Sequence, residues 1–175
     1  MCIRDSCDLE KAVDAVVASA FGYQGQKCSA CSRAIVHEKV YDEFVKRLKP
    51  KVEAIKLGHP SERTNAFGPM VDGAAKRKTL EYIEAGKKEG KLLVGGAAGP
   101  STGHYVVPTV FTDVAPTARI SQEEIFGPVL AVIKVRDFEE GLAVANNTEY
   151  GLTGSVFTND EQKKEPVSYT HLSTS

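Results

Sequence analysis

Residues 25–33 are Gly25-Gln26-Lys27-Cys28-Ser29-Ala30-Cys31-Ser32-Arg33, a short segment of small and polar residues that carries two thiols. The segment follows a stretch with one apolar helical face and precedes a short apolar run. A thiol at the end of such an element is where a cysteine enzyme would carry its nucleophile. We expect the rest of the chain either to shape this loop or to form the other wall of a cleft that faces it.

The elements on either side of this loop are predicted from hydrophobic periodicity. Apolar residues recur at steps of three and four over residues 9–20, which predicts an amphipathic helix. Asp8 is expected to cap this helix and Gly22 to end it. After the loop, residues 33–37 are mostly apolar and predict a buried strand.

The same alternation of helix and strand continues to residue 158. Further helices are predicted over 40–55, 72–89 and 138–146, and further strands over 91–94, 105–111, 129–133 and 154–158. Pro50 predicts a kink or two shorter helices, and Pro108 predicts an edge strand or a bulge. The apolar runs are continuous, as in strands buried on both faces. We therefore predict an α/β fold, a mostly parallel sheet with helices on both faces, in one domain over residues 7–160.

Composition excludes several functional classes. The chain has 175 residues, the length of one domain, and a formal net charge of -1 with both signs interspersed. This balance argues against nucleic acid or an anionic membrane as the main partner. No apolar run approaches the ~18 residues that span a bilayer, and no signal peptide is recognisable. The four cysteines crowd at one end of an ordinary composition, which favours reduced thiols in a cytoplasmic protein.

The two ends differ from the residues between them. Residues 1–6 and 166–175 resemble peptides encoded by sequencing-adapter DNA at the edges of assembled reads. We expect both to be artificial, so that the chain is a piece of a longer gene, and we predict no element of the fold in them. Residues 161–165 are assigned to neither part.

Cys28 has three interpretations from its local sequence. A free cysteine is most often a small buried hydrophobe. Lys27 beside it would favour a reactive thiolate instead. Cys28 and Cys31 also form a C-x-x-C pair, but a redox pair normally follows a strand and opens a helix, the reverse of the order here. A zinc site needs a second pair of ligands, and no histidine has the required spacing, so no metal is expected.

The second segment that suits chemistry is residues 122–128. Glu123 and Glu124 offer carboxylates, Phe126 offers a flat apolar face, and a Gly-Pro turn stiffens the loop. These groups suit a ribose diol and a planar ring. The alternative is a solvated acidic loop with the phenylalanine packed into the core.

Three motifs, in order and spacing, resemble the aldehyde dehydrogenase superfamily: Gly25–Ala30, Glu123–Pro128 and Asn146–Thr153. Residues 21–33 and 82–90 are most similar to its 1-pyrroline-5-carboxylate (L-glutamate γ-semialdehyde) dehydrogenase subfamily. The resemblance covers residues 7–160 and implies part of that family's catalytic domain.

The resemblance implies a role for Cys28 as the nucleophile. Its thiolate would attack the aldehyde to give a thiohemiacetal, which passes hydride to NAD and leaves a thioester for hydrolysis. The backbone N–H of Cys28 would donate to the oxyanion. Glu124 would accept hydrogen bonds from the nicotinamide ribose, and Phe126 would pack near the ring.

Other residues receive weaker roles from the same resemblance. Ser29 and Lys27 would flank the aldehyde as weak substrate contacts. Cys31, Arg33 and residues 146–153 are expected to be scaffold.

The family's Gly-rich cofactor segment, oxyanion asparagine and water-activating glutamate are absent, as is the downstream segment that anchors the substrate and completes oligomerisation. We expect the isolated chain to be inactive, although its parent, a homo-oligomer, would oxidise L-glutamate γ-semialdehyde to glutamate in proline and arginine degradation. Three alternatives remain open. They are another semialdehyde or aliphatic aldehyde as substrate, a thiol-redox or metal module on Cys28 and Cys31, and a fragment that only mediates association through uncovered sheet surface.

Overall fold

The computed structural model describes residues 1–4 and 6–159, which are built around one six-stranded sheet. The order of its strands is β3 (Lys91–Val94), β4 (Thr109–Thr112), β5 (Val129–Val135), β2 (Arg33–His37), β1 (Cys2–Ile3) and β6 (Val156–Phe157). All neighbouring strands are parallel except the antiparallel pair β3–β4. The predicted mostly parallel sheet is confirmed.

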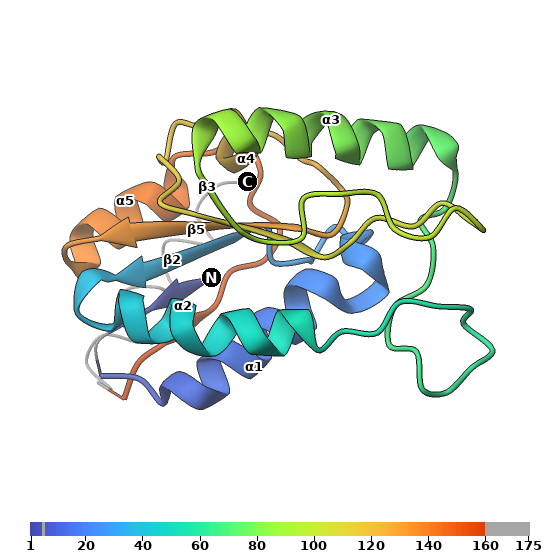
Figure 1. Cartoon of the computed structure of the whole chain (residues 1–175). Coiled ribbons are helices and arrows are strands. Elements are labelled where there is room, and N and C mark those ends of the chain that lie inside the picture. The colour runs from blue at the N-terminus through green and yellow to red at the C-terminus, as the bar shows by residue number, and fades with distance from the viewer. Residues whose placement is uncertain (5, 160–175) are drawn as a thin grey trace.

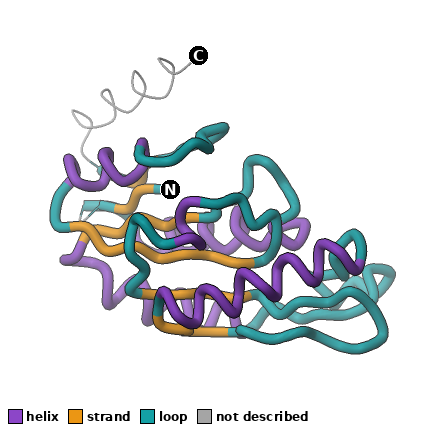
Figure 2. The backbone as a smooth tube through the Cα atoms, turned by 90° about the horizontal axis from the view of Figure 1, so that it is seen from above, coloured by secondary structure: helices purple, strands orange, loops and turns teal. Residues whose placement is uncertain are grey.

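Helices cover both faces of the sheet, as predicted (Figure 1). α1 (Leu9–Phe21) and α2 (Glu38–Glu53) pack together on one face. α3 (Gly73–Glu89), α4 (Arg119–Gln122) and α5 (Phe138–Asn146) lie on the other. Long loops from residues 57–71 and 95–107 extend at the same end of the sheet (Figure 2). Among the described residues, no helix combines the length and the apolar character that crossing a membrane requires.

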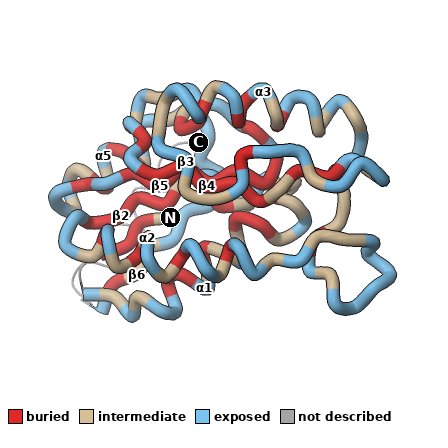
Figure 3. The backbone as a smooth tube through the Cα atoms, viewed as in Figure 1, coloured by how far each residue is buried: buried red, intermediate tan, exposed pale blue. Residues whose placement is uncertain are grey.

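β5 shows why its sequence is continuously apolar. Leu130 and Val132 belong to the core cluster under α1 and α2, whereas Ala131 and Ile133 belong to the cluster under α3 and α5. Successive side chains of a strand point to opposite faces, so a strand covered on both faces needs apolar residues at every position. Figure 3 shows this buried band between the helix layers.

α2 is one helix that runs through Pro50, so the prediction of two shorter helices is wrong. Phe44, Leu48 and Val52 are all buried on the face that packs against α1 and the sheet. Pro50 lies in the last turn, where its missing N–H removes one hydrogen bond at most. Packing of the shared apolar face on both sides of the proline outweighs that loss.

β4 is shorter than the predicted strand 105–111 and is not an edge strand, since it lies between β3 and β5. Proline has no N–H to donate to a ladder, so the strand begins at Thr109, directly after Pro108. The register irregularity is in β3 instead, between Leu92 and Val94.

Residues 2–3 form β1, an element that the sequence did not predict. Ile3 is 1% exposed, and β1 pairs with both β2 and β6. Next to it Arg4 is buried, and no described residue forms a hydrogen bond with its Nε or Nη1 atom. Buried polar atoms without a hydrogen bond cost free energy, and the ring of Phe138, whose centroid is 4.6 Å from Cζ of Arg4, offsets part of that cost. The artificial origin of the two ends stays a prediction. The predictions made for residues 161–175 fall outside the described residues.

Candidate active site

The cysteine loop leaves α1 through a strained turn, η1 (Gly22–Gly25). Tyr23 and Gln24 have φ values of 54° and 59°, in the left-handed region that non-glycine residues rarely occupy. Such strain persists only where the surroundings enforce it, and it concentrates at functional sites. The sequence did not predict this turn, because neither residue type favours it.

The two thiols of the C-x-x-C pair have different surroundings. Cys28 is exposed, and within residues 1–4 and 6–159 no hydrogen bond uses its backbone N–H. Cys31 is buried in the core cluster, and its thiol donates to the carbonyl of Arg33 at 3.4 Å. Both thiols are free. Across the described part of the chain, no group of three or more His, Cys, Asp or Glu side chains could hold a metal ion.

Cys28 opens into a cavity of about 270 Å³ that is lined mainly by three separate segments, with Met1, Ser19, Ala20 and Val129 completing the lining. The first is the cysteine loop, residues 25–33. The second, residues 121–127, is called the anchored wall, and the third, within residues 148–155, is called the open wall. All five predicted site residues line this cavity: Lys27, Cys28, Ser29, Glu124 and Phe126. The volume lies just below the roughly 300–1,000 Å³ usual for small-molecule sites.

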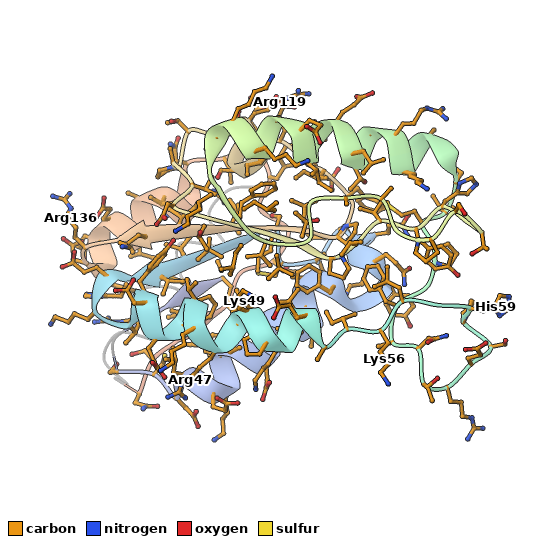
Figure 4. The ribbon with its side chains drawn as sticks, viewed as in Figure 1. Arg47, Lys49, Lys56, His59, Arg119 and Arg136 are labelled. Carbon is orange, nitrogen blue, oxygen red and sulfur yellow. The ribbon has the colours of Figure 1, made fainter. Side chains whose placement is uncertain are left out.

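The anchored wall engages one of its two carboxylates and leaves the other free. Glu123 Oε2 accepts from the Tyr82 hydroxyl at 2.6 Å and from Arg119 Nε at 3.0 Å, and these bonds hold the pKa of Glu123 below its usual value. Figure 4 shows Arg119 beside α3. The carboxylate of Glu124 has no hydrogen bond or ion pair to any described residue, although its main-chain carbonyl accepts from Lys78 Nζ at 2.9 Å. Both oxygens of Glu124 are therefore available to a ligand, whereas Glu123 has one oxygen engaged by the protein.

Phe126 projects from the same wall rather than into the core. It is 42% exposed and has a φ of 57°, while the neighbouring Ile125 is 4% exposed. The alternative in which the phenylalanine packs into the core is therefore wrong. Ile125 provides the core contact, and the strained backbone turns the ring of Phe126 toward the cavity.

Backbone contact joins the anchored wall to the cysteine loop. Gly25 has a φ of +67°, and a methyl group added there would lie 2.3 Å from the carbonyl oxygen of Gly127. That distance is shorter than any non-bonded contact, so only glycine fits at position 25. The main chains of the two loops are therefore in direct contact.

The weaker substrate candidates lie at the rim. Lys27 Nζ is 5.8 Å from the ring centroid of Tyr23, so its ammonium group faces η1. Ser29 is exposed beside Cys28. Neither position gives further support to the predicted contact of these residues with the substrate.

The open wall contains residues that the sequence assigned to scaffold. Tyr150 and Leu152 line the cavity and are 53% and 68% exposed. The Asn146–Thr153 motif was the available signal, because a family motif that contains two exposed apolar residues indicates a ligand surface. Arg33 fastens the base of this wall, donating from Nη1 and Nη2 to the carbonyls of Val144 and Ala145, both at 3.1 Å. Burial lowers the pKa of Arg33.

The chain is similar in sequence and in fold to known proteins. The model of the aldehyde dehydrogenase family matches residues 1–170. A 1-pyrroline-5-carboxylate dehydrogenase of Geobacillus sp. (strain WCH70) is 52% identical over 163 residues, which are 93% of this chain and 32% of that protein. The chain therefore spans about a third of the length of the curated relatives it matches.

Two solved structures have closely similar folds. A 1-pyrroline-5-carboxylate dehydrogenase from Thermus with bound NAD has a TM-score of 0.93 at 45% identity, over 97% of this chain and 33% of that chain. A gamma-glutamyl-gamma-aminobutyraldehyde dehydrogenase from Burkholderia cenocepacia has a TM-score of 0.92 at 40% identity, over 95% of this chain and 34% of that chain. Because the two TM-scores are nearly equal, the fold does not distinguish one aldehyde from another.

Proposed function

The chain belongs to the aldehyde dehydrogenase family, and from this premise we propose that it carries the nucleophile and the cofactor-ribose carboxylate of an enzyme that oxidises L-glutamate γ-semialdehyde to glutamate with NAD. One observation carries the proposal. The exposed thiol of Cys28 and the unpartnered carboxylate of Glu124 line the same cavity, although they are far apart in the sequence.

Cys28 is the nucleophile in this proposal. Its thiolate attacks the carbonyl carbon of the aldehyde, and the carbonyl oxygen gains the negative charge. The backbone N–H of Cys28 is free of other acceptors among the described residues, so it can donate to that oxygen. Ser29 and Lys27 flank the aldehyde as weaker contacts.

The anchored wall fits the nicotinamide end of NAD. When bound, NAD supplies the hydride acceptor. The carboxylate of Glu124 accepts hydrogen bonds from the ribose hydroxyls, and the exposed ring of Phe126 provides an apolar surface for a planar group. A cavity of about 270 Å³ has room for a small aldehyde and the nicotinamide end but not for a whole dinucleotide, so other parts of the protein hold the adenine half.

The substrate is proposed from the relatives. Those at about 50% identity are named 1-pyrroline-5-carboxylate dehydrogenase, which supports L-glutamate γ-semialdehyde as the substrate and a place in proline degradation. Another semialdehyde or an aliphatic aldehyde is the second candidate, since a structure that acts on a different aldehyde is almost equally similar. We further propose that the whole protein is cytoplasmic and homo-oligomeric.

The proposal is tested in a chimaera, in which residues 7–159 replace the matching third of the Geobacillus protein. The chimaera should form NADH when supplied with 1-pyrroline-5-carboxylate and NAD. Cys28→Ala should abolish this activity, whereas Cys31→Ser should leave most of it, because Cys31 is a packing residue. Activity that survives Cys28→Ala, or is lost equally in both variants, would contradict the assignment and favour a module that uses both thiols.

The isolated chain is expected to form no NADH under the same conditions. NADH formation by the purified 175-residue chain, abolished by Cys28→Ala, would show that the described residues suffice for catalysis.

A further inference from the structure

The anchored wall carries two adjacent carboxylates, of which one is already engaged by the protein through one of its oxygens. Tyr82 and Arg119 both donate to Glu123 Oε2, which leaves Glu124 as the free carboxylate. Adjacent residues of an extended loop point in different directions, so a loop that rotated about its axis would exchange them. The presentation of Glu124 therefore depends on what fixes the main chain of this loop.

α3 supplies that fixation through Lys78 and Tyr82, which lie one turn apart on the same side of the helix. Lys78 Nζ donates to the carbonyl of Glu124 at 2.9 Å, and the Tyr82 hydroxyl donates to the side chain of Glu123 at 2.6 Å. Two cations lie near the ring of Tyr82, with Lys78 Nζ 5.8 Å and Arg119 Cζ 4.6 Å from its centroid. One helix thus holds both residues of the pair, one by its main chain and one by its side chain.

A third contact lets the main chain of this loop approach α3 closely. A methyl group added at Gly127 would lie 2.4 Å from Oγ1 of Thr79, a fully buried residue of α3. On its other side the carbonyl of Gly127 meets Gly25 of the cysteine loop. Thr79, Gly127 and Gly25 therefore form a continuous stack from α3 to the loop of the nucleophile.

We propose that Lys78 and Tyr82 are positioning residues, which fix the main chain of residues 123–127 so that Glu124, and not Glu123, is presented to the cofactor ribose. The inference rests on the proposed function for the role of Glu124. The fixation itself is a property of the chain without a cofactor, so the two can fail separately.

The first experiment measures amide hydrogen exchange over residues 123–127 in the 175-residue chain. Lys78→Met and Tyr82→Phe should each raise exchange of the Glu123 amide, which donates to the carbonyl of Arg119 at 2.9 Å, about fivefold, as expected for the loss of one modest hydrogen bond, and Lys78→Arg should restore protection. Lys76→Met is the matched control. Lys76 makes the same kind of bond from the same helix, at 3.3 Å, but to the carbonyl of Gly103. Unchanged exchange in both test variants, or an equal rise in the control, overturns the proposal.

The second experiment uses the chimaera described above. Lys78→Met should raise the KM for NAD about fivefold, change kcat less than twofold and leave the KM for the aldehyde unchanged, as expected when only cofactor binding is weakened. A fall in kcat together with an equal rise in the KM for NAD and in the KM for the aldehyde would mean general destabilisation and would overturn the positioning role. Glu124→Gln tests the proposed function separately. If Glu124→Gln leaves the KM for NAD unchanged, Glu124 does not bind the cofactor ribose. Whether Lys78 and Tyr82 fix the loop is still tested by the exchange experiment on the 175-residue chain.

Discussion

The anchored wall and the open wall line the same cavity, but they are held in different ways. The anchored wall packs Ser121 and Ile125 into the core, each 4% exposed, and is bonded to α3. The open wall exposes Tyr150 and Leu152 between two attached ends, since Arg33 binds its base and Ser155 accepts from the N–H of Cys2. A wall that must present a carboxylate in one direction needs such support, whereas exposed apolar residues on the other wall gain most from burial by a ligand or by further protein.

The largest effect is expected where the anchored wall meets the cysteine loop. Gly25→Ala places a methyl group 2.3 Å from the carbonyl oxygen of Gly127 at a φ of +67°. Left-handed strain and overpacking together should lower the free energy of unfolding by about 4 kcal/mol. Urea denaturation measures this loss. Gly151→Ala on the open wall is the matched control, since an added methyl group there has no atom within 4 Å, and its effect should be within about 0.5 kcal/mol. Equal losses in both variants would remove the distinction between the walls.

A second pair of variants compares the apolar residues of the two walls. Ile125→Ala should cost about 3 kcal/mol, because it leaves a cavity in the core. Leu152→Ala should cost less than about 0.5 kcal/mol, because its side chain is mostly in water. The midpoints of thermal unfolding should differ accordingly. A large loss for Leu152→Ala would mean that the open wall is as well packed as the anchored wall.

A third variant releases the base of the open wall. Arg33→Met removes two charge-assisted hydrogen bonds to the C-terminal turn of α5 and should cost about 2 kcal/mol. Amide exchange should rise over residues 147–155 and stay unchanged over residues 123–127. Arg33→Lys should restore only part of the protection, since an ammonium group does not reproduce the planar fork. A rise confined to the anchored wall would contradict this assignment.

The smallest effect concerns the titration of the anchored wall. The Tyr82 hydroxyl and the Arg119 guanidinium hold the pKa of Glu123 below its ordinary value of 4.5, with a smaller contribution from Lys78. Because the pKa is lower in the folded chain, the stabilisation is present above about pH 4.5 and is lost as the pH falls through the folded pKa. Tyr82→Phe should move this pKa upward toward 4.5, as NMR titration of the carboxyl carbon would show. An unchanged pKa would mean that the hydrogen bond does not persist in solution.

Much of the fold follows from local patterns in the sequence. Asp8 caps the helix that follows, as predicted, by accepting from the main-chain N–H of Lys11. The apolar run of β5 predicted a strand buried on both faces. These predictions succeed because capping and periodicity involve neighbouring residues only.

The departures arise where packing overrides a local preference. α2 continues through Pro50 because its buried face extends beyond the proline. Tyr23, Gln24, Asp113 and Phe126 adopt left-handed backbone conformations that their residue types disfavour, and of these Phe126 lines the cavity. Local propensity does not predict such strain, because the surrounding structure imposes it.

The sequence by itself determined the α/β architecture, the position of a thiol between a helix and a strand, and the motifs that resemble the family. Only the tertiary structure decided which groups of those motifs face the cavity. It exposed Cys28 and buried Cys31, engaged Glu123 and freed Glu124, and brought the open wall into the site. Adjacent residues of the same type are equivalent in a sequence, and only contacts with distant elements such as α3 make them different.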